Sequence, residues 1–77
     1  MSETGGDIDI TTIVVSWNTR DLLARCLASV ERELEASGLR GEIVVVDNAS
    51  TDGTAKMVRE RFPAASLVAL EENRGFA

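Results

Sequence analysis

Two adjacent polar residues, Asp47 and Asn48, directly follow the uninterrupted apolar run Ile43–Val46. Such a run is typical of a strand that is buried on both faces of a sheet. Ligands of open parallel α/β sheets bind at the carboxyl ends of the strands, where these two side chains are expected. A carboxylate there can accept a hydrogen bond from a sugar hydroxyl or a base N–H, and the imide N–H of uracil or thymine suits it. The alternative is that both residues only form an Asx-turn and cap the next helix.

A second polar group, Ser16-Trp17-Asn18, follows the apolar run Ile13–Val15. Trp17 offers a flat face on which a base or a sugar could stack, and a partly buried packing aromatic is the alternative for this residue. The usual phosphate-binding signatures are absent, since no G-x-G-x-x-G follows this run and the chain has no Walker lysine loop. The pattern therefore favours contacts to a base or a sugar over a pyrophosphate cradled on the first helix.

The composition restricts the chemistry to carboxylates. The 77 residues include 13 Asp and Glu but no His, so acid, base or metal chemistry would have to come from Asp and Glu. Cys26 is the only cysteine, which excludes an internal disulfide, and it is predicted to fill a small space in the core. The net charge of −5, without a Lys- or Arg-rich run, argues against a nucleic-acid partner and gives no support for binding to an anionic membrane surface.

The length and the apolar content indicate one small globular domain. The apolar share is 44%, which is ordinary for a folded chain. No apolar run approaches the roughly 20 residues that span a bilayer, and the polar start is unlike a signal peptide. We therefore expect a cytoplasmic protein without a transmembrane segment, whose residues 1–7 form a flexible tail. In a complete protein the domain could work at the inner face of the membrane.

The periodicity of the chain predicts the order strand, helix, strand, helix, strand. The strands are expected over Ile8–Val15, from Ile43 and over Ser66–Leu70, and the helices over about 19–37 and 52–62. Asn18 or Thr19 is expected to cap the first helix, which Gly38 would end in a left-handed conformation. Ser50, Thr51 and Asp52 are expected to cap the second helix rather than to touch a ligand.

Two right-handed crossovers would make this sheet parallel, with the strand order 3-2-1 and with helices covering it. The arrangement is half of a doubly wound fold. The polar groups that follow the three strands would then meet at one edge of the sheet, namely Ser16–Asn18, Asp47–Asn48 and Asn73–Gly75. This convergence favours a binding crevice over a purely local turn at Asp47.

Three segments, Ile13–Asn18, Val44–Thr54 and Glu72–Ala77, carry a resemblance to a known family. In this order they resemble the amino-terminal part of a family 2 glycosyltransferase of the GT-A fold. The residues of the second and third segments resemble those of the rhamnosyltransferase-like branch in particular. The resemblance implies an α/β fold, the parallel three-stranded β-α-β-α-β half of this Rossmann-like nucleotide-diphospho-sugar transferase fold. It also implies a function in cell-wall or polysaccharide biosynthesis. The complete protein would transfer a sugar, with rhamnose as one candidate, from a nucleoside diphosphate sugar to an acceptor.

The resemblance also implies roles for single residues. Asp47 matches the acidic residue that contacts the base of the donor, which would be of the uridine or thymidine type, and Asn48 stands where many members have a second Asp. The remaining residues expected to bind the nucleotide sugar come from the segments after the first and third strands: Ser16, Trp17, Asn18, Asn73, Arg74 and Gly75.

The chain departs from the family pattern at its end, because it contains neither the metal-binding Asp-x-Asp that family members place after a fourth strand nor the catalytic base that follows later. Residues 8–77 are therefore expected to be the nucleotide-binding part of a glycosyltransferase domain, truncated before the metal motif and inactive alone. The complete enzyme would use Mg²⁺ or Mn²⁺, whereas this fragment would bind no metal. The alternatives are a non-catalytic module that binds a nucleotide or a protein partner, and an inactive truncated product. Without a fourth strand, the first strand would have an unpaired edge, and this edge could pair with a second copy of the chain.

Overall fold

The computed structural model describes residues 8–72. Five elements follow one another along the chain: β1 (Ile10–Ser16), α1 (Arg20–Ser37), β2 (Gly41–Asn48), α2 (Thr54–Arg61) and β3 (Ser66–Leu70). The expected tail, residues 1–7, and the expected contact residues Asn73, Arg74 and Gly75 lie outside the described residues. The order of elements is the one that the periodicity predicts, and the bounds of β3 agree residue for residue.

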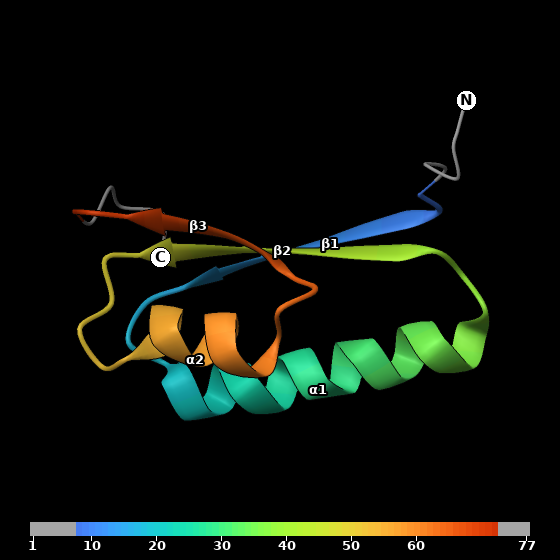
Figure 1. Cartoon of the computed structure of the whole chain (residues 1–77), viewed down its shortest axis with the longest axis horizontal. Helices are drawn as coiled ribbons and strands as arrows, with labels where there is room; N and C mark the ends of the chain where they lie inside the picture. Colours follow the sequence, from blue (N-terminus) through green and yellow to red (C-terminus); the bar gives the residue numbers. More distant parts are fainter. Residues whose placement is uncertain (1–7, 73–77) are drawn as a thin grey trace.

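The three strands form one parallel sheet in which β2 lies between β1 and β3. This confirms the predicted α/β class and the predicted strand order. Both helices lie on the same side of the sheet, because two right-handed crossovers that step in one direction place both connections on one face (Figure 1). The other face of the sheet carries no element of residues 8–72.

The core lies between the sheet and the helices. In α1 the buried residues are Leu23, Ala24 and Leu27, and Val30 and Leu34 pack half-buried beside them. They meet buried residues of β2 and α2 and the residue that follows α2: Ile43, Val45, Met57, Val58 and Phe62. Gly38 ends α1 with φ of 73°, a left-handed conformation that a residue without Cβ adopts at little cost, as predicted. Neither helix has the length and apolar content needed to cross a bilayer.

Several details differ from the sequence-based expectation. Strand β1 begins at Ile10 rather than Ile8 and includes Ser16. Cys26 is exposed and does not fill the core, because the residues that α1 buries are Leu23, Ala24 and Leu27. Strand β2 begins at Gly41, since Ile10 already pairs with that residue. Helix α2 begins at Thr54 rather than Asp52, because the Asp52 side chain accepts a hydrogen bond from the N–H of Thr54 and stands outside the helix.

The face of the sheet opposite the helices carries apolar side chains. Ile13 is 66% exposed, and Val15 and Val68 are each more than two-fifths exposed. Their partners in β2, Val44 and Val46, are half-buried. This open face therefore runs across all three strands, in contrast to the face on which α1 and α2 pack.

Candidate functional site

The strand register brings two of the predicted groups together. Ser16 pairs with Asp47 across β1 and β2, and both residues stand at the carboxyl ends of their strands. Asp47 and Ser16 are each 3% exposed, and Asn48 is fully buried. The loops that follow, residues 17–19 and 49–53, lie side by side at this end of the sheet (Figure 1). The predicted convergence of the first two polar groups is therefore seen in the fold.

The Asp47 carboxylate is held by its own loop. The Ser50 hydroxyl donates to Asp47 Oδ1. The N–H of Ala49 donates to the Asp47 carbonyl at 3.0 Å, in a tight turn in which Ala49 has φ of 62°. The first N–H of α2 is bound by Asp52, so Asp47 does not cap that helix. Among residues 8–72 no hydrogen bond reaches Asp47 Oδ2, the atom that a base N–H could address.

Trp17 and Asn18 form the turn between β1 and α1. Trp17 is 48% exposed, which leaves part of its ring open to a flat ligand. Asn18 has φ of 49°, a conformation that Asn tolerates better than most residues. Its N–H donates to Ser50 Oγ at 2.8 Å, and its Oδ1 accepts from the N–H of Thr51 at 2.7 Å. The side chain of Asn18 thus joins the two loops.

Thr19 stands at the N-cap position of α1, as expected, but its side chain makes no capping hydrogen bond. Thr19 Oγ1 contacts Ser16 Oγ at 2.8 Å, and Asn18 is engaged with the loop after β2. The first N–H of α1, that of Arg20, donates instead to Asp52 Oδ2 at 3.0 Å. A cap supplied from 32 residues further along the chain leaves no local pattern in the sequence.

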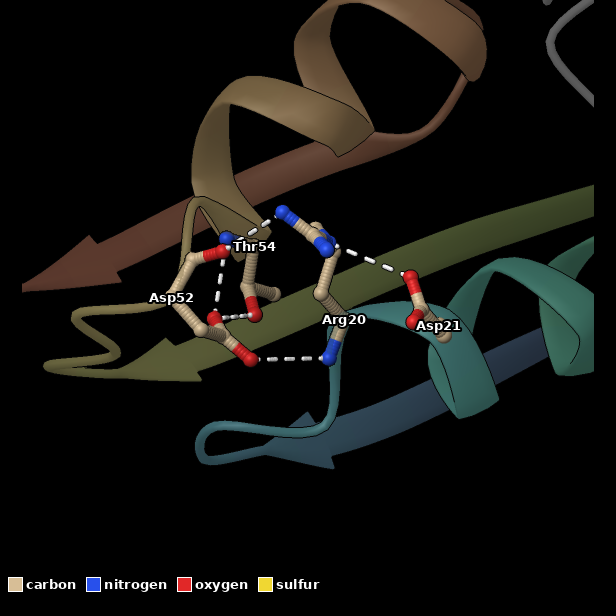
Figure 2. A network of polar contacts seen from close by, with 4 residues as sticks. All are labelled: Arg20, Asp21, Asp52 and Thr54. Carbon is tan, nitrogen blue, oxygen red and sulfur yellow. Dashed lines mark hydrogen bonds and ion pairs between the residues drawn. The ribbon is translucent and has the colours of Figure 1, made fainter.

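Asp52 forms the centre of a small polar network with Arg20 and Thr54 (Figure 2). Its Oδ1 accepts from the N–H of Thr54 at 3.1 Å and from the Thr54 hydroxyl. The Thr54 hydroxyl, with the N–H of Arg20, holds the pKa of Asp52 below its ordinary value. Arg20 Nη1 donates to the Asp52 carbonyl at 3.1 Å, and Arg20 Nε contacts Asp21 Oδ1 at 3.1 Å.

The described residues do not fit a divalent metal ion. No group of three carboxylate, thiol or imidazole side chains lies close together in residues 8–72. The Asp47 and Asp52 carboxylates instead accept hydrogen bonds from neighbouring hydroxyl and N–H groups. What these residues can do chemically is accept hydrogen bonds and present an aromatic face.

A hollow of about 620 Å³ lies at the opposite end of the sheet. It is bordered by the last turns of α1, the start of β2 and the segment before β3, with Leu34, Leu39 and Ile43 among its apolar lining residues. Of the residues predicted to bind a nucleotide, none of those that the structure describes lines it. The polar edge and this hollow are therefore separate features.

At the level of sequence, one family model and two curated proteins match this chain. Residues 11–77 match the family model of glycosyl transferase family 2. Two curated relatives from Rhizobium meliloti (strain 1021) are the succinoglycan biosynthesis proteins ExoO and ExoU. Each is 37% identical to this chain, over 68 and 70 residues respectively, and each match covers 87% of the chain. The chain spans about a fifth of the length of these relatives, 19% in both cases.

A solved structure shows the same architecture. The mannosyltransferase PcManGT from Pyrobaculum calidifontis, in complex with GDP-Man and Mn²⁺, superposes with a TM-score of 0.62 and is 34% identical in sequence. The match covers 88% of this chain and 21% of that one. The three parallel strands and their helices thus correspond to part of a GT-A glycosyltransferase. With the family model matching all but the first ten residues, this chain belongs to glycosyl transferase family 2.

Proposed function

We propose that this chain forms the nucleotide-binding part of an enzyme that transfers a sugar from a nucleoside diphosphate donor to an acceptor in polysaccharide biosynthesis. The observation that carries the proposal is the pairing of Ser16 with Asp47 at the carboxyl end of a parallel sheet. Membership of glycosyl transferase family 2 and the naming of two relatives for succinoglycan biosynthesis support it.

In this proposal Asp47 recognises the base. Its Oδ1 is held by Ser50, which fixes the plane of the carboxylate and leaves Oδ2 to accept from a ring N–H. Trp17 provides the face on which the base or the ribose stacks. Ser16, Asn18 and Asn48, with Asn73, Arg74 and Gly75 further along the sequence, are the other residues that we propose bind the nucleotide sugar.

The base of the donor follows from the same chemistry. Uracil and thymine each present one imide N–H to a carboxylate, and guanine presents a ring N–H beside an amino group. Uridine or thymidine is the donor type that the motif implies, and GDP-Man in the complex of PcManGT makes guanosine the third candidate. The donor sugars to compare first are rhamnose, which the resemblance of the motifs suggests, and mannose, which is the sugar in the complex of PcManGT.

The residues of this chain bind and orient the donor, and the remaining chemistry belongs to the complete enzyme. A divalent ion, when bound there, neutralises the diphosphate leaving group, and Mn²⁺ in the complex of PcManGT makes this ion the first to test. We expect the 77-residue chain alone to bind nucleotide without transferring sugar, because residues 8–72 contain no cluster of metal ligands.

Calorimetry with the 77-residue chain tests the proposal. UDP, dTDP and GDP are compared with CDP, which lacks the ring N–H. We expect binding of at least one of the first three and weaker binding of CDP. Equal binding of all four, or of none, would contradict base recognition by Asp47.

Two matched variants locate the binding energy. Asp47→Asn removes a carboxylate at the carboxyl end of β2, and Glu42→Gln removes one near the amino end of the same strand. Loss of a charge-assisted hydrogen bond predicts that Asp47→Asn weakens binding by about 1.5–3 kcal/mol, with no change for Glu42→Gln. Circular dichroism of both variants checks that the fold is retained. Unchanged affinity of a folded Asp47→Asn variant would leave Asp47 with a structural role only.

A further inference from the structure

One carboxylate serves the amino termini of both helices. Asp52 Oδ2 accepts from the N–H of Arg20, the first residue of α1, at 3.0 Å. Its Oδ1 accepts from the N–H of Thr54, the first residue of α2, at 3.1 Å. The two oxygens of one side chain thus point to helices that begin 34 residues apart in the sequence (Figure 2). A negative charge at this place also suits the dipoles of both helices.

The contact is reciprocal. Arg20 Nη1 donates to the backbone carbonyl of Asp52 at 3.1 Å, so the first residue of α1 holds the loop before α2 as that loop holds α1. Gly53 stands beside this contact, where a Cβ would lie 3.6 Å from Arg20 Nη1. The charged groups around Asp52 are the Arg20 guanidinium and, through it, Asp21, with Asp47 at the other end of the same loop.

The same two loops meet a second time next to the proposed pocket. Asn18 N–H donates to Ser50 Oγ, and Ser50 Oγ–H donates to Asp47 Oδ1. A chain of hydrogen bonds therefore runs from the turn that carries Trp17 to the carboxylate that we assign to the base. This chain requires the two loops to keep their separation, and the described contacts that set this separation on the helix side are those of Asp52.

We propose that Asp52 is a positioning residue for nucleotide binding, because it joins the starts of α1 and α2 and thereby holds Trp17 and Asn18 against Asp47 and Ser50. Asp52 contacts no ligand in this account and acts through the two loops. The proposal rests on the proposed function for its effect on binding, but its effect on the loops can be measured without any ligand.

Asp52→Asn is the test variant, because it keeps the shape of the side chain but replaces one acceptor oxygen with an NH₂ group that faces a backbone N–H. Asp52→Ser is the second variant, since Ser still caps a helix locally but is too short to serve two helices. Gly38→Ala is the matched control. It destabilises α1 from its other end, where φ is 73° and a Cβ meets no atom within 4 Å.

Two readouts separate positioning from general stability. Amide hydrogen exchange reports the cross-loop hydrogen bonds through the N–H groups of Asn18 and Thr51. Calorimetry with UDP, dTDP and GDP reports binding. We expect both Asp52 variants to speed the exchange of these two amides and to weaken nucleotide affinity about five- to tenfold, whereas Gly38→Ala changes neither at the same fraction folded.

The outcomes are distinguishable. If the wild-type chain binds none of the three nucleotides, the proposed function fails, and amide exchange alone decides whether Asp52 holds the loops. If exchange at Asn18 and Thr51 is unchanged in the Asp52 variants, the positioning role is overturned. It is also overturned if Gly38→Ala has the same effect as the Asp52 variants on both readouts. If Asp52→Asn does not fold, Asp52→Ser is judged by the same criteria.

Discussion

The two ends of the sheet are built on different principles. At the carboxyl end, Ser16, Asp47 and Asn48 are buried polar residues, and the loops above them are joined by hydrogen bonds between side chains and backbone. At the amino end, Gly41 and Leu39 border the hollow of about 620 Å³, whose lining combines apolar residues with the charged residues Glu31, Arg32 and Glu35 of α1. The hollow and the buried polar residues therefore lie at opposite ends of the sheet.

The difference shows why the volume of a hollow is a poor guide to the site in this chain. A nucleotide needs acceptors and donors at fixed positions, and such groups are costly to bury unless they are hydrogen-bonded. The carboxyl end meets this condition through contacts that cross between loops, as at Asn18 and Asp52. At the amino end, the Leu34 side chain lies against Gly41, in the space that a Cβ at this position would need.

Filling the amino end should give the largest change in stability. A Cβ at Gly41 would lie 2.8 Å from Leu34 Cγ and closer still to both methyl carbons of that side chain. We expect Gly41→Ala to lower the free energy of unfolding by about 1 kcal/mol, because the half-buried Leu34 side chain beside the hollow must change its rotamer, without a change in nucleotide affinity. Urea unfolding and calorimetry measure the two quantities.

A double-mutant cycle identifies the cause of that loss. In the background of Leu34→Ala the space next to Gly41 is open, so Gly41→Ala should cost less there than in the wild type. An equal cost in both backgrounds would show that Leu34 is not the obstacle. Weakened nucleotide binding in Gly41→Ala would mean that the two ends of the sheet are coupled.

The open face between the two ends should mediate self-association. Ile13 is 66% exposed on this face and lies in β1, an edge strand of the described sheet. The unpaired N–H and C=O groups of such a strand are a template for pairing with a second copy. We expect Ile13→Lys to raise the dissociation constant of self-association about tenfold. Leu22→Lys is the control, because Leu22 is 61% exposed on α1. A wild-type chain that stays monomeric at high concentration in sedimentation, and still melts cooperatively, would contradict this prediction.

Acid should weaken the carboxyl end through Asp52, with a smaller effect. The pKa of Asp52 is lowered in the folded chain by the Thr54 hydroxyl and the N–H of Arg20, so the ionised carboxylate stabilises the fold. This contribution is complete above the pKa of the unfolded chain, about 3.9, and is lost as the pH falls through the lowered value. The urea midpoint of the wild type should therefore fall more steeply between about pH 4 and 2 than that of Asp52→Asn. Parallel curves would show that Asp52 does not stabilise the fold by its charge.

The local parts of the fold follow from the sequence. The β-branched run at Ile43–Val46 is typical of a strand, and the spacing of Leu23 and Leu27 is typical of a helix with one buried side. Both patterns lie within a single element, so the elements and their order could be predicted. Gly38 is a similar case, because a left-handed helix end favours one residue type. Parallel pairing of neighbouring strands then predicts that Ser16 and Asp47 lie near one another at the carboxyl edge, and the observed register pairs the two residues directly.

The contacts between loops do not follow from the sequence. The cap of α1 comes from Asp52, 32 residues after Arg20, and no periodicity or spacing reports a hydrogen bond over that distance. Cys26 illustrates the same limit on a helix, since the direction in which α1 turns its apolar stripe depends on where α2 packs. Asp52 could be recognised as a helix-start residue, but not as the partner of a second helix.

Amide chemical-shift mapping of the labelled chain, titrated with UDP and separately with GDP, tests the central claim that the carboxyl end binds the nucleotide. We expect shifts at residues 16–20 and 47–54 that saturate with one dissociation constant. We expect no shifts at the residues around the hollow, such as Leu34, Leu39 and Ala65. Saturable shifts confined to those residues of the hollow, with none at Trp17 or Asp47, would contradict the account.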